Sequence, residues 1–215
     1  MFDRLKSFIK ERKLHNNVIA PGWDAIEEEF LKIYPGQNRP KHYGVTIPWT
    51  CGGSDPLDGI SIYDGGSFWH FVTFGLTELY AKESDNEEFS GYGYEMTFKL
   101  KKSENDEQEI ADLCKMFQRI ARNTFNKNEI FHPYERLYVS KDGIDSKLTS
   151  KLVGFICIND PSVNSLNTVN GKVAFIEFIG ATEDELNSLT TKDEIKEFYK
   201  KLGTDITDLK RDSII

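Results

Sequence analysis

Apolar and polar residues alternate strictly between residues 92 and 100, which is the most regular pattern in the chain. Successive side chains of a strand point to opposite faces of a sheet, so this pattern predicts a strand with one buried face and one polar face. Shorter apolar runs predict six further strands, at residues 43–49, 57–63, 68–74, 138–140, 152–158 and 173–179.

The strand predicted at residues 173–179 is almost continuously apolar, which favours a central position in the sheet. Asn170-Gly171, just before it, is typical of a hairpin turn. Residues 82–89 are acidic and polar, so we expect a surface loop there.

Apolar residues recur at helical spacing in three other segments. Residues 1–13 place lysines and arginines opposite an apolar face, which predicts an amphipathic helix that packs on its own domain. Pro21 begins a second helix, and residues 34–36 end it. The apolar stripe over residues 110–121 predicts a third, and residues 123–132 are expected to be irregular.

Two capping boxes near the C-terminus predict two more helices. Thr182 precedes Glu185, and Thr191 precedes Glu194, at the spacing in which side chain and backbone bond reciprocally. Gly203 follows the second segment and suits a left-handed C-cap.

Together these elements predict an α+β fold, with a mixed, largely antiparallel β-sheet flanked by helices in a single domain. A chain of 215 residues is long enough for one large core, and no linker or repeat divides it. We assign residues 1–20 to the N-terminal amphipathic helix and its connection, and residues 21–215 to the domain.

The charge and the cysteines narrow the function classes. A formal net charge of -8 argues against binding to nucleic acid or to an anionic membrane surface. The same charge suits a basic protein partner, although it also keeps any domain soluble. Cys51, Cys114 and Cys157 form no CxxC pair, so we expect buried thiols in a reducing compartment. The N-terminus does not read as a signal peptide and no apolar run is long enough to span a membrane, so we expect a cytoplasmic protein.

The strongest candidate for catalysis is His70, in the middle of a predicted strand. With Asp55 or Asp58 it would make the His–Asp pair of a small hydrolase or a metal-dependent enzyme. No GxSxG nucleophile motif accompanies it, and the four histidines form no HxxxH or HxH pair. A structural histidine is therefore the favoured interpretation, and we assign no catalytic residue, cofactor or metal ligand.

A second candidate is the start of the alternating strand, where Gly91 and Gly93 lie among tyrosines. Glycine in a strand often marks a bulge or the close approach of another backbone, so a partner's peptide strand could add here. The alternative interpretation is an ordinary strand start.

Four segments in a fixed order carry a family resemblance. They are GGSDPLD (52–58), FWHFVTFGLTELY (68–80), SGYGYEMTFKLK (90–101) and VAFIEFIGATEDEL (173–186). Together they resemble the N-terminal domain of suppressor of fused, from about Pro21 to the C-terminus. The resemblance implies a mixed β-sheet with flanking helices, and it implies a binding protein that is not an enzyme.

Animal members of that family hold zinc-finger transcription factors of the Hedgehog pathway by gripping an extended peptide strand between two domains. Because this chain resembles the N-terminal domain alone, we expect a single-domain member of the bacterial type, whose relatives are thought to be immunity proteins against polymorphic toxins. The expected function is thus protein binding, with toxin neutralisation as its finer form and a scaffold in a larger assembly as an alternative. The expected partner-binding residues are Asp55, Asp58, His70, Glu87, Glu88, Gly91, Tyr92 and Tyr94.

Overall fold

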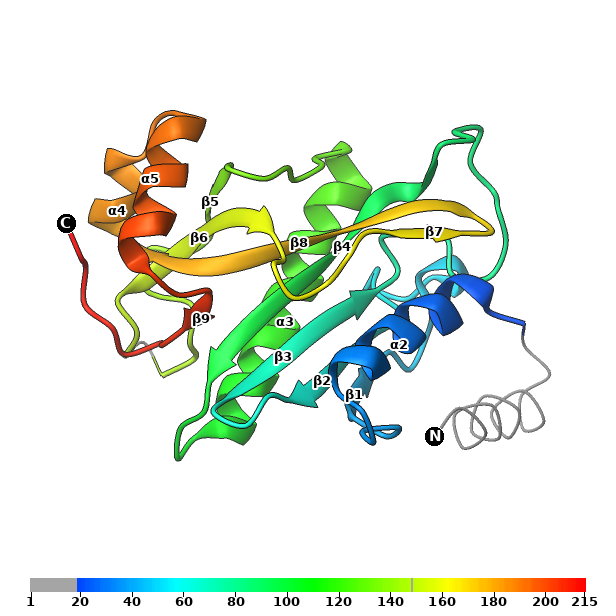
Figure 1. Cartoon of the computed structure of the whole chain (residues 1–215), viewed down its shortest axis with the longest axis horizontal. Coiled ribbons are helices and arrows are strands. Elements are labelled where there is room, and N and C mark those ends of the chain that lie inside the picture. Colours follow the sequence, from blue (N-terminus) through cyan, green and yellow to red (C-terminus); the bar gives the residue numbers. More distant parts are fainter. Residues whose placement is uncertain (1–18, 148) are drawn as a thin grey trace.

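The computed structural model describes residues 19–147 and 149–215, so the helix predicted at residues 1–13 lies outside the described residues. The described chain forms a nine-stranded sheet with helices on both faces (Figure 1). The helices are α2 (Pro21–Ile33), α3 (Asp106–Lys127), α4 (Glu183–Ser188) and α5 (Lys192–Leu202). The strands are β1 (Lys41–Gly44), β2 (Gly59–Asp64), β3 (Phe68–Phe74), β4 (Phe89–Lys101), β5 (Arg136–Tyr138), β6 (Leu152–Asn159), β7 (Leu166–Thr168), β8 (Gly171–Thr182) and β9 (Ile206–Thr207).

The strand order is β1-β2-β3-β4-β8-β6-β5, with β7 paired to β8 and β9 paired to β4. The β4–β8 and β4–β9 pairs are parallel, and the other pairs are antiparallel. The predicted α+β class, with a mixed and largely antiparallel sheet, is therefore confirmed. The predicted strand at residues 173–179 lies within β8, which is central between β4 and β6.

The two faces of the sheet carry different helices. Phe71 packs in the cluster that contains the α3 residues, whereas its neighbour Val72 packs in the cluster that contains the α2 residues. Likewise Phe155 faces α3, and Ile156 faces α4 and α5. Because successive side chains of a strand point to opposite faces, α3 covers one face, and α2, α4 and α5 cover the other (Figure 1).

The polar face of β4 differs from the prediction, because it is buried as deeply as the apolar face. Lys99 is 2% exposed, and its ammonium lies 3.1 Å from Asp160, 3.0 Å from Glu177 and 2.7 Å from Asp205. The carboxylates come from segments distant in sequence, and they supply the charge that lets a lysine lie inside the fold.

Several local signals are confirmed. Both capping boxes are present, and Gly203 caps α5 with φ 71°. The hairpin predicted at Asn170-Gly171 joins β7 to β8, although its turn lies at Val169 and Asn170, because Thr168 already pairs with Gly171.

Other boundaries were wrong. The strand expected over residues 43–49 is β1, which ends at Gly44, and residues 49–51 form a 3-10 turn. Helix α3 continues to Lys127 through part of the segment expected to be irregular. Of the three thiols, Cys114 and Cys157 are buried as predicted, but Cys51 is exposed.

Candidate functional site

The connection between β3 and β4, residues 75–88, forms a long loop that passes close to the turn at residues 56–58. Gly75 begins it with φ 133°, a conformation that favours glycine, and a Cβ there would lie 2.9 Å from the backbone nitrogen of Asp58. This close approach fixes the path by which the chain leaves β3.

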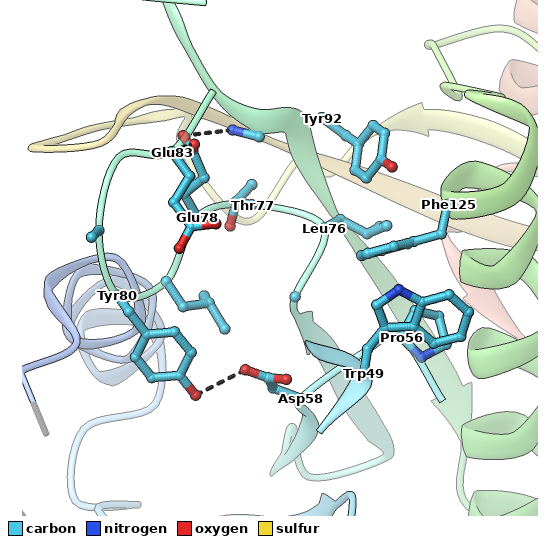
Figure 2. A pocket seen from close by; sticks show the side chains of 14 residues that line it. Trp49, Pro56, Asp58, Leu76, Thr77, Glu78, Tyr80, Glu83, Tyr92 and Phe125 are labelled. Atoms are coloured by element: carbon cyan, nitrogen blue, oxygen red, sulfur yellow. Dashed lines mark hydrogen bonds between the residues drawn. The ribbon is translucent and has the colours of Figure 1, made fainter. Parts of the chain in front are cut away.

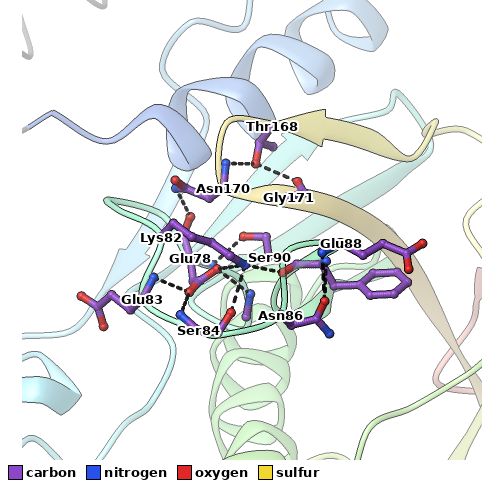
Figure 3. Close-up of polar contacts among 12 residues, drawn as sticks. Glu78, Lys82, Glu83, Ser84, Asn86, Glu88, Ser90, Thr168, Asn170 and Gly171 are labelled. Atoms are coloured by element: carbon purple, nitrogen blue, oxygen red, sulfur yellow. Dashed lines mark hydrogen bonds and ion pairs between the residues drawn. The ribbon is translucent and has the colours of Figure 1, made fainter.

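Glu78 holds this loop closed from inside (Figure 3). Its Oε1 accepts the backbone N–H groups of Glu83, at 2.7 Å, and Ser84, at 2.5 Å. Its Oε2 accepts Lys82 Nζ at 2.8 Å and the Gly91 N–H at 3.0 Å. Burial raises the pKa of Glu78, but these hydrogen bonds outweigh burial and lower it to about 2.

Further contacts tie the loop to its neighbours. The Lys82 ammonium also donates to the carbonyl of Phe89 at 2.6 Å, which closes the loop onto the start of β4. Ser90 Oγ accepts the Glu78 N–H at 2.9 Å, and Asn170 Nδ2 donates to the Glu78 carbonyl at 2.7 Å (Figure 3). The loop is therefore fixed at both ends and at the β7–β8 hairpin.

A pocket of about 230 Å³ lies under the loop, and we call it the loop pocket (Figure 2). One wall is aromatic: the ring of Phe125 lies 5.6 Å from that of Trp49 and 5.2 Å from that of Tyr92. The opposite margin is polar, because the Tyr80 hydroxyl donates to Asp58 at 2.8 Å. The lining residues are Trp49, Pro56, Asp58, Gly75, Leu76, Thr77, Glu78, Leu79, Tyr80, Ala81, Glu83, Gly91, Tyr92 and Phe125.

The loop that covers the pocket is strongly acidic on its outer side. Glu83, Asp85, Glu87 and Glu88 are all exposed, and Glu88 pairs with Lys172 at 2.8 Å. An aromatic wall beside exposed carboxylates suits an apolar or cationic side chain, because aromatic faces attract cations and the carboxylates neutralise basic neighbours.

The structure brings together part of the set predicted from sequence. Asp58, Gly91 and Tyr92 line the loop pocket, and Glu87 and Glu88 lie on the exposed part of its loop. Asp55 lies apart from them. It pairs with Arg122 at 2.5 Å and lines a separate cavity of about 300 Å³ against α3.

Two predicted residues lie inside the fold and drop out as direct contacts. Tyr94 is 2% exposed, and its hydroxyl bonds Thr124 at 3.0 Å. His70 is 0% exposed, so a partner docking on the closed fold cannot reach it. Both residues lie on strands, as predicted. The alternation over residues 92–100 already placed Tyr94 on the apolar face of its strand, which is the buried one. The burial of His70 depends instead on packing against Phe30 of α2, a neighbour distant in sequence.

Both partners that the sequence suggested for His70, Asp55 and Asp58, are wrong. His70 Nε2 lies 2.8 Å from Asp160, and its Nδ1 lies 2.8 Å from the Tyr34 hydroxyl, so neither Asp55 nor Asp58 bonds it. Burial lowers the pKa of His70, although the bond to Asp160 acts in the opposite direction. The neutral ring therefore donates from Nε2 to the carboxylate and accepts the hydroxyl proton at Nδ1, which is a structural arrangement.

Sequence reasoning missed most of the residues that line the pocket, among them Trp49, Leu76, Glu78, Tyr80 and Phe125. Leu76, Glu78 and Tyr80 belong to the segment FWHFVTFGLTELY, which had been singled out for other reasons. Trp49 and Phe125 carried no local signal, because each contributes only through a neighbour distant in sequence.

Within residues 19–147 and 149–215, no three histidine, cysteine, aspartate or glutamate side chains gather as metal ligands would. A search of the same residues for a helix both long and apolar enough to cross a bilayer finds none.

Comparison with known proteins agrees with this fold. The family model described as suppressor of fused protein (SUFU) matches residues 53–212. The suppressor of fused homologs of Homo sapiens and Mus musculus are each 29% identical over 180 residues, which is 78% of this chain and 37% of those proteins. The chain thus spans 37% of the length of the curated relatives it matches.

Solved structures give the same result. The crystal structure of Drosophila Suppressor of Fused is similar with a TM-score of 0.82 and 26% identity, over 91% of this chain and 51% of that one. A chain of the Sufu-Fu complex crystal structure is similar with a TM-score of 0.79 and 27% identity, over 91% of this chain and 92% of that one. The crystal structure of a suppressor of fused homolog from Neisseria gonorrhoeae FA 1090 is similar with a TM-score of 0.60 and 13% identity, over 90% of this chain and 97% of that one. At this identity the likeness shows the fold alone.

Proposed function

Since the chain belongs to the suppressor of fused family, we propose that it is a non-enzymatic domain that acts in the cytoplasm by binding another protein. The observation that carries this proposal is the loop pocket, a concave aromatic site whose covering loop is already fixed by Glu78. A pre-formed site lowers the entropic cost of association, as expected of a binding surface. A similar chain was solved in the Sufu-Fu complex, which supports protein as the class of partner.

The chemistry of the pocket specifies the partner further. Trp49, Tyr92 and Phe125 offer aromatic surface for one apolar or aromatic side chain. Glu83 and Glu87 on the covering loop then favour lysine or arginine residues next to that side chain. The partner segment that fits is therefore an apolar anchor flanked by basic residues.

The finer form of the proposal is that the partner is a basic toxin domain, which this chain neutralises by occupying it. The net charge of -8 supports this, because opposite charges on two partners increase the rate of association. The expectation that this chain is a single-domain family member of the bacterial type, whose relatives are thought to be immunity proteins, supports it as well. A large secreted toxin encoded next to this chain would favour immunity, and a different neighbour would favour a scaffold.

Two tyrosines provide a matched test. Tyr80 at the loop pocket is 47% exposed, and Tyr138 on β5 is 50% exposed and does not line the pocket. The protein recovered by pull-down from the native host should bind the unmodified chain and Tyr138→Ala equally. Tyr80→Ala should bind about 30-fold more weakly, which corresponds to the roughly 2 kcal/mol of an interface hot spot.

Isothermal titration calorimetry measures the three affinities, and circular dichroism confirms that both variants fold. Equal affinity of Tyr80→Ala and Tyr138→Ala would place the interface elsewhere. Recovery of no partner under any growth condition would count against protein binding itself. For the finer proposal, co-expression of the chain should rescue growth of cells that express the neighbouring toxin.

A further inference from the structure

Glu95 lies on β4 beneath the loop pocket and is 0% exposed. Its Oε1 accepts three hydrogen bonds: the Gly75 N–H at 3.0 Å, the Thr77 N–H at 2.9 Å and the Thr77 hydroxyl at 2.7 Å. Gly75, Leu76 and Thr77 are also residues that line the pocket. One buried carboxylate thus fixes a segment of the pocket lining from behind.

We propose that Glu95 is a positioning residue whose ionised carboxylate orders residues 75–77, so that the loop pocket is formed when Glu95 is charged and loosens, with the Glu95 side chain still buried, when Glu95 is protonated. The consequence for binding rests on the proposed function of the pocket. The structural part of the proposal, which concerns the order of residues 75–77, does not.

The hydrogen bonds around Glu95 favour the charged form. The Gly75 and Thr77 N–H groups can only donate, and the Thr73 hydroxyl donates to Glu95 Oε2 at 2.6 Å while its oxygen accepts the Met96 N–H at 2.9 Å. Hydrogen bonds to an ionised carboxylate are about twice as strong as those to a neutral carboxyl. Protonation would therefore weaken the bonds that hold residues 75–77, and a proton on Oε2 would require the Thr73 hydroxyl to turn from donor to acceptor.

No positive charge compensates Glu95 among the described residues, since its bonded neighbours are all neutral. Lys99, on the same face of β4, has its ammonium bonded to the carboxylates of Asp160, Glu177 and Asp205. On β8, Glu95 lies opposite Phe175. The ionisable β8 residue closest in sequence to Phe175 is Glu177, and its carboxylate is bonded to Lys99.

The remaining ionisable groups near this face are also accounted for. On α2, the buried Glu29 pairs with Lys32 at 2.5 Å. Tyr63 of β2 stays neutral, because burial raises its pKa. Burial raises the pKa of Glu95 itself to about 7, although the hydrogen bonds from Thr73, Thr77 and Gly75 act in the opposite direction. The switch between the two states therefore lies near neutral pH.

Amide chemical shifts of the full ¹⁵N-labelled chain, followed from pH 5 to pH 9, test this without a partner. The Gly75 and Thr77 amides should titrate together with a midpoint near pH 7. The Gly180 amide, which donates to the uncharged Thr207 hydroxyl at 3.0 Å, serves as the control and should not follow that curve. The exchange protection of the Gly75 and Thr77 amides, which both donate to Glu95, should fall about tenfold below the midpoint, as about 1.4 kcal/mol of local order is lost.

Two variants separate positioning from mere packing. Glu95→Gln preserves the shape, because its Oε1 still accepts three donors and its amide can donate to Thr73, so the titration of Gly75 and Thr77 should disappear. Thr77→Val removes one hydroxyl donor to the ionised form, so the midpoint should rise by about 1 unit, the equivalent of one hydrogen bond to a charged group.

The absence of any titration at Gly75 and Thr77 between pH 5 and pH 9, or the same titration in Glu95→Gln, would overturn this proposal. That outcome would leave the Tyr80→Ala binding test intact. Conversely, equal binding by Tyr80→Ala and the unmodified chain would remove the proposed function and leave the titration of Glu95 unaffected.

Discussion

Replacing Glu78 by glutamine should open the loop of residues 75–88 at a cost that the structure sets. The carboxylate accepts Lys82 and three backbone N–H groups, and its pKa is lowered from 4.5 to about 2. Each pKa unit corresponds to about 1.4 kcal/mol, so the charge contributes about 3 kcal/mol to folding at pH 7. The side chain is only 11% exposed, so solvent screening removes little of this.

The sign of the pH dependence follows from the direction of the shift. A carboxylate with a lowered pKa stabilises the fold above its unfolded pKa, and this contribution is lost as pH falls through the folded pKa. The unmodified chain should therefore exceed Glu78→Gln in free energy of unfolding by about 3 kcal/mol at pH 7, and this difference should vanish between pH 4.5 and about pH 2.

Urea denaturation of both proteins across this pH range measures the difference. Glu83→Gln is the matched control, because Glu83 is exposed on the same loop and its side chain lines the pocket margin without closing the loop. It should stay within about 0.5 kcal/mol of the unmodified chain. A Glu78→Gln protein that unfolds like this control at pH 7, or that keeps its deficit unchanged at pH 2, would show that Glu78 does not hold the loop.

Three further outcomes are expected. Lys99→Met should lower the free energy of unfolding, measured by urea denaturation, by about 3–5 kcal/mol, because it leaves the carboxylates of Asp160 and Glu177 buried without their cation. A loss below about 1 kcal/mol would contradict this. The free energy of unfolding of the unmodified chain, measured relative to Glu95→Gln, should fall by about 3 kcal/mol as pH rises from 4.5 to about 7. The reason is that a carboxyl group whose pKa is raised in the fold stabilises the fold only while it is protonated. A difference between the two proteins that does not change with pH would be inconsistent with the buried charge. Gly75→Ala should lower the melting temperature, because a Cβ would lie 2.9 Å from backbone at φ 133°; an unchanged melting temperature would refute the close approach.

Local patterns predicted the elements well because their causes are local. The alternation over residues 92–100 and the capping boxes at Thr182 and Thr191 depend on neighbours within a few positions, and each was confirmed. The end of α3 was missed because residues 123–127 lack the apolar stripe, whereas Asn128 caps the helix with φ 54°.

Long-range partners could not be predicted in this way. Lys99 meets Glu177 and Asp205 across 78 and 106 residues of sequence, so nothing local marked the polar face of β4 as buried. The same limit applies to the loop pocket. Tyr92 was selected from its own strand, but Phe125, which completes the aromatic wall, lies in a segment that was expected to be irregular.

Hydrogen–deuterium exchange of the full chain, alone and with the partner recovered from the native host, locates the binding surface directly. We predict that the partner slows exchange in residues 75–92, which cover and line the loop pocket, and leaves α5 unchanged. Slower exchange confined to other segments, with residues 75–92 exchanging as in the free chain, would show that this protein does not bind through the pocket.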